Sequence, residues 1–164
     1  MAKNKTDEEI KKELQEQEST NYLRKAPKAL QNVIRNSFVA GIVLLIISVI
    51  LVFTELTIGM VIPPALLGII AIVTGINIRN SAINGTYKTF KGTVVSCEYP
   101  IALKTRTKAV VFASEGKRYK ITYNRHKLKI GDIVTVYAPS SVFVYERNGI
   151  YNINSYYAVN IEKT

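Results

Sequence analysis

A block of apolar residues constrains this chain more than any other feature of its sequence. From Phe38 to Ile78 almost every residue is apolar, and Glu55 is the one charged residue in the block. A helix needs about 20 apolar residues to cross the hydrocarbon core of a bilayer, so the block is long enough for two spans. One long core helix would need a large soluble protein around it, which a chain of 164 residues does not supply. The block therefore predicts a hairpin of two transmembrane helices.

The two predicted spans are joined by a short connection. The first span is expected at about residues 34–53 and the second at about residues 56–78, so the helices must be antiparallel neighbours. Basic residues flank the outer ends of both spans, and the connection has none. These residues are Arg24, Lys25, Lys28 and Arg35 before the first span, and Arg79, Lys88 and Lys91 after the second. The positive-inside rule then predicts that both termini are cytoplasmic.

Small residues recur at helical spacing in both predicted spans. Small side chains let helices approach closely in lipid, where no hydrophobic effect drives their association. The candidate helix-packing residues are Gly41, Ser48, Gly68, Ala71 and Gly75. Packing within the hairpin and homo-oligomerisation through the same face both fit this pattern. Pro63 and Pro64, which lack backbone donors, are expected to shape the start of the second helix or to form a hinge.

The predicted hairpin lies between a polar arm and a strand-rich domain. Residues 1–33 form a polar arm, expected to be partly helical from a capping box at Thr6–Glu9; residues 34–80 form the hairpin; and residues 81–164 show the alternating pattern of strands. Seven short strands are predicted, near residues 87–99, 106–113, 118–124, 132–137, 142–147, 150–154 and 156–161. The strongest turn signal is Asn148-Gly149, which suits a two-residue type I′ hairpin. The predicted fold is a transmembrane α-helical hairpin followed by an all-β domain, a small antiparallel barrel of OB-like or SH3-like kind.

The predicted β domain is basic and rich in tyrosine. The chain has a formal net charge of +10, and residues 82–164 contain thirteen Lys or Arg against five acids. The candidate lipid-binding or partner-binding surface consists of Lys117, Arg118, Lys120, Arg125, Lys127 and Lys129. Basic residues among aromatic ones suit anionic lipid, a protein partner or single-stranded nucleic acid. Tethering beside a bilayer favours lipid or protein over nucleic acid.

The sequence offers little for catalysis. His126 is the only histidine and Cys97 the only cysteine, so the standard Cys/His zinc sites are excluded. No P-loop, Gly-x-Gly-x-x-Gly or Gly-x-Ser-x-Gly motif is present. Asp132 follows Gly131 in a predicted turn, where an aspartate serves the backbone. The sequence therefore predicts no enzyme activity, no catalytic residues, no metal and no cofactor.

Two short motifs in the β domain carry a resemblance to known membrane proteins. They are Gly92-Thr-Val-Val-Ser96 and Gly131-Asp-Ile-Val-Thr-Val-Tyr137. The layout resembles small bacterial membrane proteins that join one or two spans to a compact β domain, and it is similar to that of NfeD-like proteins. This resemblance implies an OB-like cytosolic domain, a bacterial plasma membrane and association with flotillin-type scaffolds. It assigns no functional residues.

These observations favour a non-enzymatic integral membrane protein. Its basic cytosolic β domain is expected to interact with a protein partner or with anionic lipid, in a scaffold or assembly role. A homo-oligomer is the other expected association. The alternative is a small pore or a transport accessory subunit, although neither predicted span has an ionisable residue in its interior.

Overall fold

The computed structural model describes residues 21, 23, 25–54, 58–100, 106–125 and 127–164. The chain divides into two compact units, residues 1–85 and residues 86–164, which are described separately below. The second unit is called the β domain. The capping box predicted at Thr6–Glu9 and the single histidine, His126, lie outside the described residues.

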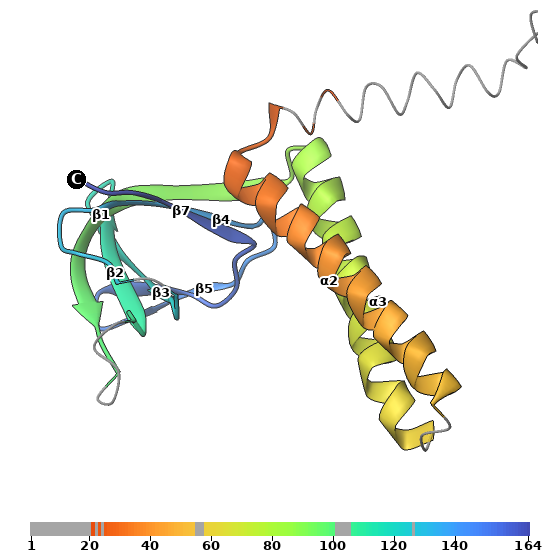
Figure 1. The fold of residues 1–164 in the computed structure, drawn as a ribbon. Coiled ribbons are helices and arrows are strands. Elements are labelled where there is room, and N and C mark those ends of the chain that lie inside the picture. Colours follow the sequence, from red (N-terminus) through yellow and green to blue (C-terminus); the bar gives the residue numbers. More distant parts are fainter. Residues whose placement is uncertain (1–20, 22, 24, 55–57, 101–105, 126) are drawn as a thin grey trace, which may run out of the picture. The chain divides into compact units, whose positions relative to one another are not determined.

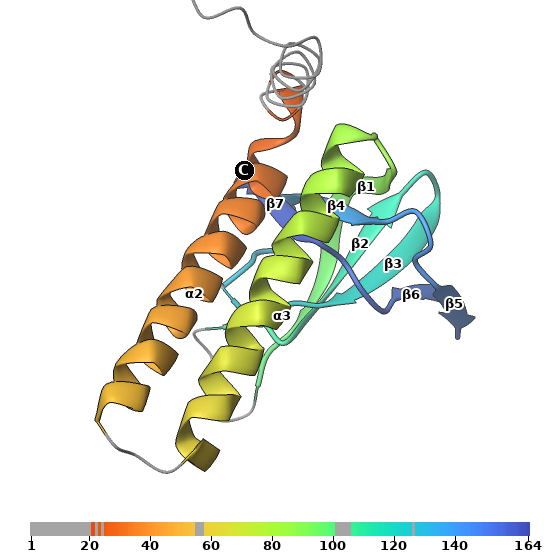
Figure 2. The ribbon, with the colours of Figure 1, turned by 90° about the vertical axis from the view of Figure 1, so that its right-hand side faces the viewer.

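The first unit contains two long helices that lie side by side, α2 (Lys28–Phe53) and α3 (Ile58–Ile83) (Figures 1 and 2). Pro27 precedes α2, and its carbonyl oxygen accepts hydrogen bonds from the amides of Leu30 and Gln31 at 2.9 and 3.1 Å. Each helix has 26 residues, which corresponds to about 39 Å at 1.5 Å per residue and exceeds the ~30 Å hydrocarbon core of a bilayer. The predicted helical hairpin is confirmed. Both helices extend beyond the apolar block into the polar residues that flank it.

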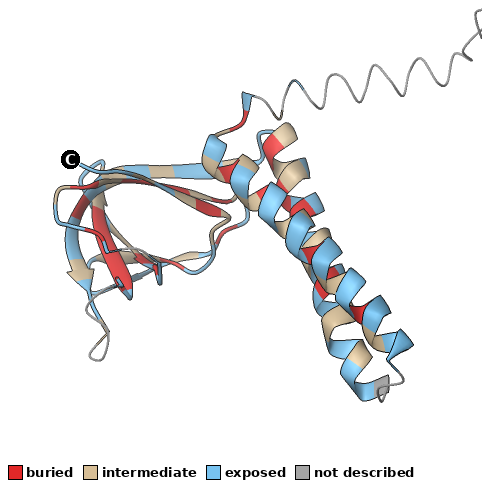
Figure 3. Ribbon diagram, in the orientation of Figure 1, coloured by how far each residue is buried: buried red, intermediate tan, exposed pale blue. Residues whose placement is uncertain are grey.

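Most apolar side chains of the hairpin are exposed rather than packed. In the most apolar 18-residue stretch of each helix only 11% is buried. Exposed positions, shown in pale blue, cover much of both helices in Figure 3. Ile46, Ile50, Leu67 and Ile70 are each at least two-fifths exposed. A core helix of a soluble protein would bury such residues, since large exposed apolar surfaces are rare on soluble proteins. Both helices are long enough and apolar enough to cross a membrane.

Pro63 and Pro64 lie inside α3, near its start. They follow the first turn of the helix, which begins at Ile58, and the helix continues past them to Ile83. Two consecutive positions of α3 therefore donate no backbone hydrogen bond.

The β domain is built on one seven-stranded sheet, and the seven predicted strands are confirmed. They are β1 (Tyr87–Glu98), β2 (Ala109–Ser114), β3 (Lys117–Thr122), β4 (Ile133–Pro139), β5 (Val144–Arg147), β6 (Ile150–Ile153) and β7 (Ala158–Glu162). Two hairpins have two-residue turns, Glu115-Gly116 between β2 and β3 and Asn148-Gly149 between β5 and β6. All four turn residues have positive φ, as type I′ turns require, so the turn predicted at Asn148-Gly149 is confirmed.

The sheet differs from the expected closed antiparallel barrel in two respects. Its strand order is β5-β6-β3-β2-β1-β4-β7, so β5 and β7 are edges and the sheet is not closed. β3 and β6 pair in parallel, with Arg118 beside Ile150 and Lys120 beside Asn152. The reason is that β6 does not follow β3 through a hairpin. β4 and β5 lie between them in the chain, and this long connection returns in the same direction.

The sheet curls because the two halves of β1 pair with different strands. Residues Tyr87–Thr93 of β1 pair with β4, and Thr93–Glu98 pair with β2. A bulge between Val94 and Ser96 leaves Val95 without a partner in β2, which increases the local bend. At Gly92 the two strands are so close that a Cβ would lie 2.1 Å from the carbonyl oxygen of Ala113.

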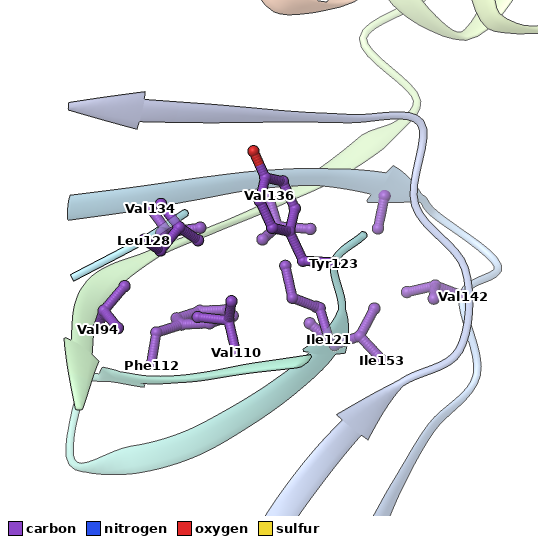
Figure 4. Packing of buried hydrophobic residues seen from close by; sticks show 11 residues of the cluster. Val94, Val110, Phe112, Ile121, Tyr123, Leu128, Val134, Val136, Val142 and Ile153 are labelled. Atoms are coloured by element: carbon purple, nitrogen blue, oxygen red, sulfur yellow. The ribbon is translucent and has the colours of Figure 1, made fainter. Parts of the chain in front are cut away.

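The hydrophobic core of the β domain lies inside this curl (Figure 4). It consists of Val94, Val110, Phe112, Ile121, Tyr123, Leu128, Val134, Val136, Ala138, Val142 and Ile153. Phe112 is the largest fully buried side chain among the described residues. Strands on both sides of β1 contribute to this single cluster, so the core joins the two halves of the sheet.

Candidate functional site

The six predicted basic surface residues do not share one face. Lys117, Arg118 and Lys120 lie on β3, and the other three, Arg125, Lys127 and Lys129, lie in the connection between β3 and β4. Because side chains alternate along a strand, Lys117 shares the core face with Tyr119, whereas Arg118 and Lys120 project from the outer face. The structure therefore separates these residues into three groups.

Lys117 lies at the end of a row of aromatic rings that leads into the core. Its Nζ is 5.4 Å from the centroid of the Tyr151 ring, a cation–π distance. The Tyr151 ring is 5.6 Å from the Tyr119 ring, which lies 5.7 Å from Phe112 and 5.2 Å from Phe90. The cation–π contact makes Tyr151 a structural partner of Lys117. Such a contact contributes about 0.5–1 kcal/mol at an exposed site.

Lys120 also has a partner within the domain. Its Nζ forms an ion pair with Oε1 of Glu98 on β1, and both side chains are partly exposed. Exposed ion pairs contribute about 1 kcal/mol or less to stability. The pair nevertheless neutralises the charge of Lys120, so Lys120 contributes less to the attraction of an external anion than its position indicates.

The outer face of β3, β6 and β5 brings together residues that are distant in sequence. Arg118 is beside Ile150, and Ile150 is beside Arg147 on β5. On the same edge the rings of Phe143 and Tyr145 stack, with centroids 6.2 Å apart and an interplanar angle of 23°. Phe143 is 69% exposed and Tyr145 is 39% exposed. We call Arg118, Arg147, Phe143 and Tyr145 the β5-side surface.

Sequence reasoning placed Arg118 in a binding surface and missed the other three residues of the β5-side surface. The Asn148-Gly149 turn does predict that Arg147 and Ile150 are opposite each other. No sequence signal shows that β6 then pairs with β3, which is what brings Arg147 and Arg118 to one face. The surface therefore depends on long-range strand pairing.

Residues 127–132 of the connection between β3 and β4 include one fully buried side chain and several hydrogen bonds. Leu128 is fully buried, its amide donates to Thr107 Oγ1 at 3.0 Å, and its carbonyl oxygen accepts from the Tyr99 hydroxyl at 2.9 Å. The Lys129 amide donates to Asp132 Oδ2 at 2.9 Å, which confirms the backbone role predicted for Asp132. Lys127 and Lys129 are exposed on this segment.

The candidate helix-packing residues lie in the first unit, and its three buried glycines are at the contact between α2 and α3. A Cβ on Gly41 would be 2.9 Å from the Gly68 carbonyl oxygen, and a Cβ on Gly68 would be 3.0 Å from the Gly41 oxygen. A Cβ on Gly75 would be 3.2 Å from Ser37 Cβ. Ser48 is buried and donates to the Leu44 carbonyl oxygen, and Ala71 is half-buried. These contacts occur within the hairpin, and homo-oligomerisation through these residues stays a prediction.

Cys97 is half-buried and packs against the core of the β domain. Burial raises the pKa of its thiol, an effect that a hydrogen bond with Tyr99 partly offsets. Since the thiolate is the nucleophilic form, a raised pKa lowers the reactivity of this cysteine. Within the part of the chain that the structure describes, no three His, Cys, Asp or Glu side chains gather in a way that could hold a metal ion.

The described residues combine an apolar helical hairpin with a β-sheet domain. The chain has two helices long and apolar enough to cross a membrane, followed by an open seven-stranded sheet with a basic and aromatic outer edge. Comparisons with protein-family models, with curated proteins and with solved structures found no match.

Proposed function

We propose that the chain is a non-enzymatic integral membrane protein whose β domain presents a basic and aromatic surface to an anionic partner, either a protein or lipid. The role is that of a scaffold or assembly factor rather than a catalyst. The observation that carries this proposal is the β5-side surface on a domain joined directly to two lipid-compatible helices. Arginine and aromatic side chains are the residue types enriched where proteins bind other molecules.

The hairpin supports anchoring in a membrane. Its exposed apolar side chains need an apolar solvent, and its close glycine contacts suit helices that associate in lipid. The basic residues that flank both spans, among them Lys25, Lys28 and Arg79, support a cytoplasmic location for both termini. The resemblance of the layout to NfeD-like proteins supports a bacterial plasma membrane and an association with scaffold proteins.

In-cell crosslinking followed by purification from gently solubilised membranes tests the proposed role. We expect the intact chain to be recovered with a stoichiometric protein partner, as a defined homo-oligomer, or with co-purified anionic lipid. A matched variant, Arg118→Gln with Arg147→Gln, is expected to lose most of that association, whereas Lys127→Gln with Lys129→Gln is expected to retain it. Recovery of only a monomer without enriched anionic lipid would contradict the proposal.

The second candidate, a small pore or transport accessory subunit, has support from one observation. Pro63 and Pro64 leave two neighbouring positions of α3 without backbone donors, and such interruptions can serve as hinges in transport proteins. Conductance or flux across proteoliposomes that contain the full chain tests this function. Silent proteoliposomes would exclude a pore formed by this chain alone.

A further inference from the structure

We infer that the β5-side surface docks onto the anionic lipid surface of the same bilayer that the hairpin spans. Phe143 and Tyr145 would enter the headgroup region, and Arg118 and Arg147 would bind lipid phosphates. This inference rests on the proposed function, which leaves open whether the partner is a protein or lipid. The partner inferred here is anionic lipid. Three observations carry it: the short turn that joins the aromatic pair to the end of β4, the composition of the surface and the shortness of the connection to α3.

The aromatic pair follows closely in the chain on the end of β4, which pairs with the start of β1. Tyr87, the first residue of β1, pairs with Pro139, the last residue of β4. A turn closed by the hydrogen bond from the Val142 amide to the Pro139 carbonyl oxygen, at 3.0 Å, leads directly to Phe143. The stacked rings therefore follow immediately after the strand end that pairs with the start of β1.

The covalent connection restricts how far this strand end can move from the membrane. α3 ends at Ile83 and β1 begins at Tyr87, so residues 84–86 alone join them. The five residues of α3 that follow the apolar block add about 7 Å at 1.5 Å per residue, and three residues extend over about 10 Å, so Tyr87 lies within about 20 Å of the end of the apolar block. A surface near Tyr87 consequently encounters the bilayer at a high effective concentration, and even weak interactions suffice for docking.

The composition of the surface suits a lipid interface. Tyrosine and other aromatic rings are enriched at the headgroup level of membranes, and each cation near an anionic surface adds about 1 kcal/mol, or about a fivefold change in binding. Arg118 and Arg147 are exposed, and neither forms an ion pair with another described residue. Lys120, which shares this outer face, is instead paired with Glu98.

A tryptophan reporter tests the docking directly, because the sequence contains no tryptophan. The Phe143→Trp variant of the full chain is reconstituted in phosphatidylcholine vesicles with and without phosphatidylglycerol. With phosphatidylglycerol present, its emission is expected to shift to shorter wavelength and to be largely quenched by brominated lipid. Without phosphatidylglycerol both effects should be much smaller. Adding Arg118→Gln or Arg147→Gln should lower the ratio of docked to undocked domain about fivefold for each arginine.

The chain offers a matched control at the opposite end of β4. Ile130 precedes β4 and is 73% exposed, while Phe143 follows β4 and is 69% exposed. The Ile130→Trp variant is expected to stay unquenched in the same vesicles, and Lys127→Gln with Lys129→Gln should not change the quenching of the Phe143→Trp variant.

Three results would overturn the docking. They are an unquenched Phe143→Trp variant, equal quenching of both reporters, and quenching that does not depend on phosphatidylglycerol. An emission change on addition of oligothymidylate, without quenching by lipid, would assign the surface to nucleic acid instead. An unquenched reporter in a chain that still purifies with a stoichiometric protein partner would refute the docking and leave the proposed function standing.

Discussion

Replacement of Gly92 by alanine is expected to unfold the β domain or to leave it severely destabilised. The new Cβ would lie 2.1 Å from the carbonyl oxygen of Ala113, 2.7 Å from its carbonyl carbon and 2.9 Å from Phe112 Cδ2. Two of these three atoms belong to the backbone of β2, so the clash cannot be relieved by rotating a side chain. Overpacking in a core costs about 1–3 kcal/mol and occasionally more, and the backbone clash places Gly92→Ala at or above the upper end of this range.

Urea denaturation of the full chain in detergent, followed by the near-ultraviolet circular dichroism of its tyrosines, measures this loss. Nine of the ten tyrosines lie in the β domain, so the signal reports mainly on that unit. Thr93→Ala, at the exposed neighbouring position of the same strand, is the matched control and should change the free energy of unfolding by less than about 0.5 kcal/mol. Equal stability of the Gly92→Ala and Thr93→Ala variants would mean that β1 and β2 are not as close as the structure places them.

Replacement of Gly41 by isoleucine is expected to separate the two helices of the hairpin. Its Cβ would lie 2.5 Å from Ile72 Cγ1 and 2.9 Å from the Gly68 carbonyl oxygen. The helices would have to move apart, which also breaks the contact between Gly75 and Ser37. The expected cost is about 1–3 kcal/mol of helix association.

A disulfide across the hairpin reports this separation. A Cβ at Gly75 would be 3.2 Å from Ser37 Cβ, near the ~3.8 Å typical of disulfides, so Ser37→Cys with Gly75→Cys in a Cys97→Ala chain should crosslink. Gly41→Ile should remove most of the crosslink. Gly59→Ile is the control because a Cβ at Gly59 meets no atom within 4 Å, and it should leave the yield unchanged. Equal yields in the two variants would argue against the Gly41–Gly68 contact.

Features that depend on local pattern are predictable from this sequence. The length of the apolar block predicts the hairpin, because about 20 apolar residues suffice for each transmembrane helix, although both helices extend into the polar residues beside the block. Alternation predicts all seven strands, and Asn148-Gly149 predicts its type I′ turn because both residues tolerate positive φ. In each case the signal lies in one continuous stretch of the sequence.

Features that depend on long-range pairing are not predictable in the same way. The parallel pairing of β3 with β6 leaves the sheet open and creates the β5-side surface, although neither strand carries a signal for its partner. The separation of Lys117 from Arg118 and Lys120 could have been derived from strand alternation alone. Glycine is needed at position 92 because Ala113 of another strand approaches closely there. The motif at Gly92–Ser96 includes this glycine, but the sequence does not show the contact that requires it.

We propose that the two apolar helices span the membrane and hold the β domain on its cytoplasmic side. Cys97 is a poor reporter of sidedness, because it is half-buried and burial raises the pKa of its thiol. Exposed single cysteines in a Cys97→Ala chain are better placed: Thr54→Cys follows the last residue of α2, and Ser140→Cys lies in the turn after β4. On intact cells, a membrane-impermeant maleimide is expected to label Thr54→Cys, and to label Ser140→Cys only after lysis. Labelling of Ser140→Cys without lysis, with Thr54→Cys protected, would contradict the account.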